Sequence, residues 1–125
     1  MITLTCTRQH ADYAMVTIFR YQALWRQSQL INVKDYPKAS GEYLTVRLFN
    51  CLLAEVEYMF DKKLDIRNPN KIGNSSGKIN IKMSHAQGIA FYRMLLTLPL
   101  TADDIYLLQI RNHWIEILDQ QILKM

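Results

Sequence analysis

The sequence lacks an uninterrupted apolar stretch of about 18 residues, the length that a membrane-spanning helix needs. Its first residues lack a basic start followed by a long apolar run, so no secretory signal is expected. With only four glycines and three prolines, the composition is that of a folding chain rather than a disordered one. These absences predict a soluble cytoplasmic protein without a membrane association.

Cysteine is also scarce, since Cys6 and Cys51 are the two in the chain. They are enough for one disulfide, but a chain with 50% hydrophobic residues can build a core without it. Two reduced thiols are therefore the expectation. Only Cys6 and His10 form a close pair of zinc-ligand residue types, whereas a zinc site usually shows two such pairs. His85 and His113 are explained as surface histidines.

Catalytic and cofactor motifs are missing as well. The segment Gly73–Lys78 resembles a phosphate-binding loop, but three residues separate its glycines where the motif has four. Ile79 follows the lysine, where the motif needs a Ser or Thr for magnesium. We therefore expect no enzyme activity, no cofactor, no metal and no small-molecule ligand.

The hydrophobic residues recur with the spacing of amphipathic helices. The chain length of 125 residues suits one domain, covering 1–125, which buries roughly 65% of its unfolded surface. Spacings of three and four predict four helices, which begin near Gln9, near Ser40 or Gly41, at Ser84 and at Thr101. The core face of the second helix is predicted to hold Val46, Phe49, Leu52, Leu53, Val56, Met59 and Phe60.

Two helix starts carry capping signals. Ser84 and Gln87 have the spacing of a capping box, in which each side chain bonds the backbone of the other residue. Thr101 is the expected N-cap of the last helix, with Asp103 and Asp104 at the positive end of its dipole. Capping also explains this carboxylate pair without a metal.

Alternating polar and apolar residues predict strands between the second and third helices. Lys78–Met83 alternates throughout, and Leu64–Arg67 alternates before a polar connection, so the two are predicted to form a β-hairpin. Ile2–Cys6 has the pattern of a short N-terminal strand, with a frayed terminus as the alternative. The predicted fold is mainly α (α+β), with four amphipathic helices packed as a small bundle, this hairpin between the second and third helices, and a possible short N-terminal strand.

Positive charge is concentrated in one segment. Residues 61–82 contain six basic and two acidic residues, which accounts for the whole net charge of +4. On the hairpin's solvent side, the candidate contact residues for an anion, a nucleic acid or a protein partner are Arg67, Lys71, Lys78, Asn80 and Lys82. The alternative is a solvated edge, whose lysines prevent pairing with other strands.

The last helix also suggests self-association. Leu108, Ile115 and Ile122 recur every seven residues beside its main apolar face, which suits a second helix of the chain or a subunit. The predicted function is a non-enzymatic protein-interaction module or accessory subunit, with another protein or a second copy as partner in a homodimer. The alternative is a weak nucleic-acid-binding domain that uses the basic hairpin around residues 62–82.

Overall fold

The computed structural model describes residues 1–32, 41–64, 77–98 and 104–124. Within these ranges the elements, in chain order, are β1 (Ile2–Thr7), α1 (Arg8–Asn32), α2 (Gly41–Leu64), β2 (Lys78–Met83), α4 (His85–Thr97) and α5 (Ile105–Ile122). The prediction of a mainly helical protein with four helices and a small β element is confirmed for the described part of the chain. Among these helices, none is both long and apolar enough to cross a membrane.

The sheet consists of β1 and β2, which pair antiparallel with Ile2 opposite Met83. The N-terminal strand is thus confirmed, but the predicted pairing of Leu64–Arg67 with β2 is not. Leu64 is the last residue of α2, and residues 65–67 lie outside the described ranges. The helix extends this far because Leu64 continues the buried stripe of Val56 and Phe60 at a spacing of four.

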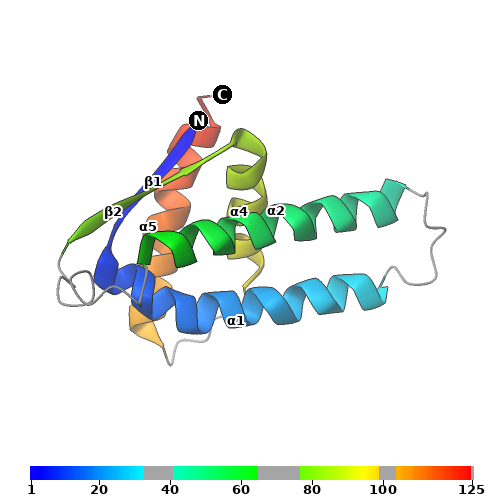
Figure 1. The fold of residues 1–125 in the computed structure, drawn as a ribbon, viewed down its shortest axis with the longest axis horizontal. Coiled ribbons are helices and arrows are strands. Elements are labelled where there is room, and N and C mark those ends of the chain that lie inside the picture. The colour runs from blue at the N-terminus through cyan, green and yellow to red at the C-terminus, as the bar shows by residue number, and fades with distance from the viewer. Residues whose placement is uncertain (33–40, 65–76, 99–103, 125) are drawn as a thin grey trace.

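A side chain of the last helix covers the free edge of β1. The Thr3 backbone N–H donates to Oε1 of Gln121 at 2.8 Å, and Nε2 of Gln121 donates to the Thr3 carbonyl at 2.7 Å. The amide of Gln121 therefore bonds β1 much as a neighbouring strand would. This contact joins residues near the two ends of the chain, which lie close together in Figure 1.

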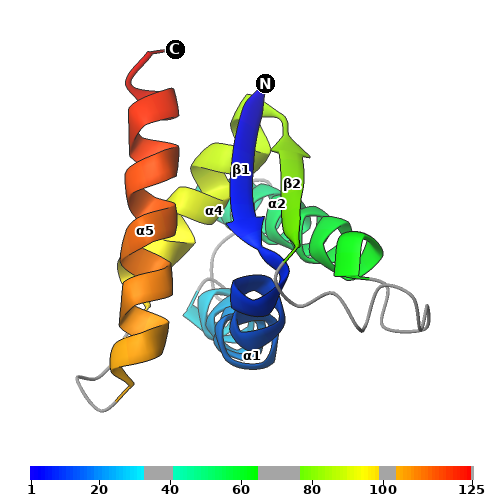
Figure 2. The same ribbon diagram turned by 90° about the vertical axis from the view of Figure 1, so that its left-hand side faces the viewer.

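The four helices form the rest of the molecule. α1 and α2 lie side by side and run in opposite directions, while α4 and α5 cross them (Figure 1). Seen from the side, the sheet lies in front of α4, with β1 beside α5 and β2 beside α2 (Figure 2). The helices therefore cover one face of the sheet and leave the other uncovered by any described element.

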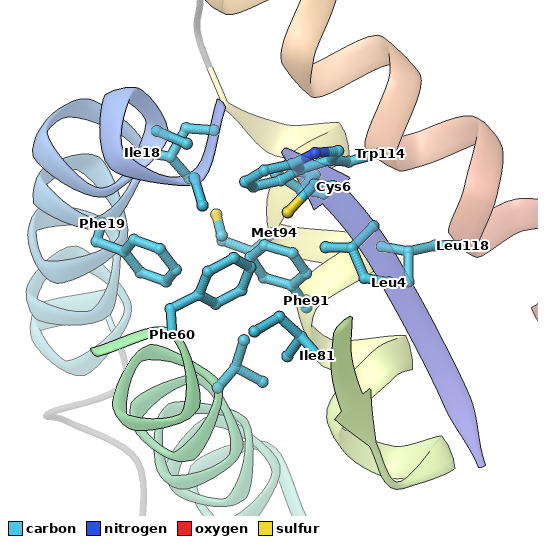
Figure 3. Close-up of a cluster of buried hydrophobic side chains, with 14 of the residues drawn as sticks. Leu4, Cys6, Ile18, Phe19, Phe60, Ile81, Phe91, Met94, Trp114 and Leu118 are labelled. Atoms are coloured by element: carbon cyan, nitrogen blue, oxygen red, sulfur yellow. The ribbon is translucent and has the colours of Figure 1, made fainter. Parts of the chain in front are cut away.

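An aromatic cluster forms the centre of the core. It holds one ring from each helix: Phe19, Phe60, Phe91 and Trp114. The centroid of Phe60 lies 5.1 Å from that of Phe19, 5.8 Å from that of Phe91 and 5.5 Å from that of Trp114. Leu4, Cys6 and Ile81 extend the cluster to the inner face of the sheet (Figure 3). This packing fixes the sheet against all four helices.

The helix caps agree in part with the prediction. Ser84 and Gln87 form the predicted capping box at the start of α4. The first residue of α5 is Ile105, and its N-cap is Asp104, whose side chain accepts from the Leu107 N–H at 2.9 Å. The predicted cap, Thr101, lies outside the described residues. A carboxylate suits the position because the N-terminal end of a helix is positive.

A buried arginine joins the start of α1 to the end of α2. Arg8 is only 6% exposed, and its guanidinium donates to the carbonyl of Leu64. Its backbone N–H donates to the Gly77 carbonyl at 2.7 Å, directly before β2. A cation is favourable at the negative end of a helix, so this contact stabilises the last turn of α2 and holds it beside the sheet.

Candidate anion-binding surface

Polar side chains occupy the uncovered face of the sheet. In β1, the buried residues Ile2, Leu4 and Cys6 alternate with threonines, and in β2 Ile81 and Met83 are buried. The strand register places each threonine opposite a polar residue of β2: Thr3 opposite Lys82, Thr5 opposite Asn80 and Thr7 opposite Lys78. We call these six residues the polar sheet face. Its position follows from the period of two along each strand.

A hydrogen bond across the polar sheet face orients Asn80. The Thr5 hydroxyl donates to Oδ1 of Asn80 at 2.7 Å. The Nδ2 group of Asn80 donates to no other described residue. Its two hydrogens are therefore available to an external acceptor such as a phosphate oxygen.

The end of α2 and the strand β2 enclose a hollow beside this face. The hollow has a volume of about 410 Å³ and is lined by Met59, Lys62, Lys63, Asn80, Ile81 and Lys82. We call it the lysine hollow. The last turn of α2 supplies Lys62 and Lys63, where positive side chains are favoured by the helix dipole. Its volume lies in the range of small-ligand sites, and it offers three ammonium groups and one amide.

No carboxylate of the described residues pairs with the lysines of this surface. Lys62, Lys63, Lys78 and Lys82 are all exposed. In the described part of the chain, Arg8 and Asp12 form an ion pair at 3.9 Å. No carboxylate oxygen in this part lies within 4.0 Å of the ammonium group of any of the four lysines. Within the described part of the chain no carboxylate balances these charges, so a multivalent anion can displace the solvent ions around them.

The structure brings together part of the predicted contact set. Lys78, Asn80 and Lys82 share the polar sheet face, whereas Arg67 and Lys71 lie outside the described residues. Sequence reasoning counted Lys62 and Lys63 in the basic segment but did not name them as site residues. Their place follows only from the extension of α2 to Leu64 and its packing against β2.

A second hollow lies on the other side of the Thr5–Asn80 bond. It has a volume of about 290 Å³ and is lined by Thr5, Cys6, Thr7, His10, Lys78 and His113. We call it the imidazole hollow. The histidines that are distant in sequence thus meet at one place, because the start of α1 and the middle of α5 both flank β1.

The thiol of the imidazole hollow is not suited to nucleophilic or metal chemistry. Cys6 is only 5% exposed, and this burial raises the pKa of its thiol to about 12. The thiolate, which is the nucleophile and the metal ligand, is therefore scarce at neutral pH. Among the described residues, no three His, Cys, Asp or Glu side chains are placed to share a metal ion.

The chain as a whole was also compared with known proteins. No family model matches it, and neither a curated protein nor a solved structure is significantly similar to it.

Proposed function

We propose that this protein is a non-enzymatic interaction domain that binds the phosphate backbone of a nucleic acid. The observation that carries the proposal is the lysine hollow. There, Lys62 and Lys63 of α2 lie beside Asn80 and Lys82 of β2, with no carboxylate at pairing distance among the described residues. An extended polyanion neutralises such a cluster and releases the counterions that it holds.

The spacing of the lysines suits a polymer better than a single small anion. Lys78 and Lys82 lie on the same face of β2, four residues and therefore about 13 Å apart. Lys62 and Lys63 extend the positive surface beyond Lys82 onto α2. Several phosphates in a row meet this arrangement, and the threonines of the polar sheet face add hydroxyl donors to phosphate oxygens.

The residue types of the surface also predict its selectivity. The polar sheet face contains threonine, lysine and asparagine, with no aromatic ring on which a base can stack. Contacts to phosphate position a protein but carry no sequence information. The proposed binding is therefore weakly dependent on base sequence and strongly dependent on salt.

Fluorescence anisotropy with labelled duplex and single-stranded oligonucleotides tests the proposal. Charge reversal in the variants K62E/K63E and K78E/K82E should each weaken binding at least roughly tenfold at about 50 mM salt. Each variant should also reduce the slope of log K against log salt by about two, because each phosphate contact contributes about 0.9. The matched control is R20E/K124E, which changes net charge equally at exposed positions away from both hollows.

Three results contradict the proposal. They are no binding to either polymer at low salt, undiminished binding by K62E/K63E or by K78E/K82E, and an equal loss in the control. Absence of binding to both polymers means that the lysines face either an acidic protein partner or only solvent. The last shows that net charge rather than this surface attracts the polymer.

A further inference from the structure

We infer that the imidazole hollow is a second phosphoryl-binding site, whose positive charge increases as its histidines become protonated. This inference rests on the proposed function, because the second site extends the same surface. Its ligand is a phosphate group of the bound polymer. Binding to the polymer should therefore strengthen below neutral pH.

The first support is the set of groups that line the hollow. Lys78 of β2, His10 of α1 and His113 of α5 come from three different elements and converge on one volume. None of the lining residues is acidic. Imidazole is the side chain that ordinarily gains a positive charge between about pH 8 and pH 5, so the pH dependence of binding is the natural test of this hollow.

The second support is the backbone beside the hollow. α1 starts at Arg8, directly after β1, and its first turn contains no acidic residue. The Thr7 hydroxyl accepts a hydrogen bond from the backbone N–H of His10 at 3.1 Å. Thr7 therefore caps the helix and also lines the hollow. The positive end of the α1 dipole thus lies beside this hollow with no acidic residue in the first turn, which favours a bound anion.

The third support is continuity with the lysine hollow. Thr5 lines the imidazole hollow and donates to Asn80, which lines the lysine hollow. Lys78 also belongs to both the imidazole hollow and the polar sheet face. One polyanion lying across the sheet therefore contacts both hollows, and the inferred site needs no separate ligand.

Other ionisable groups lie on the elements that pack around the two histidines. The ring centroids of His10 and Tyr106 lie 5.7 Å apart with the two planes nearly perpendicular, and the neutral Cys6 thiol lies on β1. Asp12 pairs with Arg8, and Asp104 accepts hydrogen bonds from the Tyr13 hydroxyl and the Leu107 N–H. Glu116 lies about one turn beyond His113 on α5.

The test is the pH dependence of oligonucleotide binding at constant ionic strength. Between about pH 8 and pH 5.5 the affinity of the unchanged protein should rise at least roughly threefold, the increment of about one added phosphate contact. His10→Gln and His113→Gln should each reduce this rise, and the double variant should abolish it. The chain's third histidine, His85, is exposed at the start of α4, so His85→Gln is the matched control and should leave the rise unchanged.

Direct contact is read from NMR. Inorganic phosphate or a short oligonucleotide, added at about pH 6, should shift the imidazole signals of His10 and His113 but not those of His85. His113 is exposed, so its variant disturbs the fold least and keeps the test decisive if His10→Gln lowers stability.

The two proposals fail in different ways. The second site is overturned if binding at about pH 8 depends on the lysines but changes neither with pH nor with substitution of the histidines. The proposed function then still stands. Equal effects of His85→Gln and the hollow variants also overturn the second site. Absence of binding at every pH overturns both.

Discussion

Two cysteines of the same chain differ in their surroundings. Cys6 lies in the core and is 5% exposed, whereas Cys51 is exposed on α2. Burial disfavours the charged thiolate, which is why the pKa of Cys6 is raised to about 12. The two thiols should therefore differ in reactivity, although the sequence presents them only as two free cysteines.

We expect one thiol per chain to react with a disulfide reagent in the native protein at about pH 8, and two after denaturation. Cys51→Ala should remove the native reaction, and Cys6→Ala should leave it in place. The unfolded Cys6 thiol ionises near pH 8.5, so its stabilising contribution is complete below that pH and is lost as the pH rises toward 12. If the two thiols react at equal rates in the native protein, the burial of Cys6 is contradicted.

Single residues were predictable where the signal is local. The Ser84–Gln87 capping box follows from a spacing of three, and it forms as predicted. The cap of α5 is Asp104 rather than Thr101, because several capping residues follow one another there and the packing decides which one begins the helix. The meeting of Cys6, His10 and His113 has no local signal.

At the scale of elements, α2 shows which part of its apolar pattern is core. Leu53, Val56 and Phe60 are buried as predicted, and Phe49, Leu52 and Met59 pack partly against the core. The leucines Leu44 and Leu48 near its start are 55% and 60% exposed. Hydrophobic periodicity identifies a helix, but it does not say how far along the helix the core extends.

The pair Leu53→Ala and Leu48→Ala separates these two environments on one helix. Both changes replace leucine by alanine, whose helix propensities are nearly equal, so the difference reports burial. Leu53→Ala should lower the free energy of unfolding by about 2–5 kcal/mol, because Leu53 is fully buried. Leu48→Ala should change it by less than about 0.5 kcal/mol. Chemical denaturation measures both, and similar losses contradict the arrangement.

Strands show the same limit. The alternation of Lys78–Met83 correctly predicted a strand with its lysines outward, because the period of two is local. It did not identify the partner, since any half-buried strand with the same period fits. The N-terminal strand pairs with β2, and the segment expected to do so begins inside α2.

For the whole molecule, the candidate site depends on contacts that sequence reasoning cannot supply. The concentration of positive charge in residues 61–82 was visible from the sequence. The lysine hollow requires that α2 and β2 pack together, and the imidazole hollow requires that α1, β1 and α5 meet. The first arrangement places its lysines beside β2, and the second places its histidines beside β1, the strand that pairs with β2.

The tie between Gln121 and Thr3 is therefore expected to stabilise the sheet as a whole. Its two hydrogen bonds, at 2.8 and 2.7 Å, satisfy the backbone of β1 on the edge that β2 does not cover. Gln121→Ala leaves the N–H and carbonyl of the half-buried Thr3 without this partner. The expected cost is about 1–3 kcal/mol in the free energy of unfolding.

Gln120 provides the matched control, because it is exposed and adjacent in sequence to Gln121. Gln120→Ala should leave stability unchanged within about 0.5 kcal/mol. Gln121→Glu should cost less than Gln121→Ala, because a carboxylate can still accept from the Thr3 N–H and loses only the donation to the Thr3 carbonyl. Amide hydrogen exchange at Thr3 should accelerate in Gln121→Ala, which removes the acceptor of the Thr3 N–H, and not in the control. Unchanged exchange at Thr3 in Gln121→Ala shows that β1 is held by β2 and the core alone.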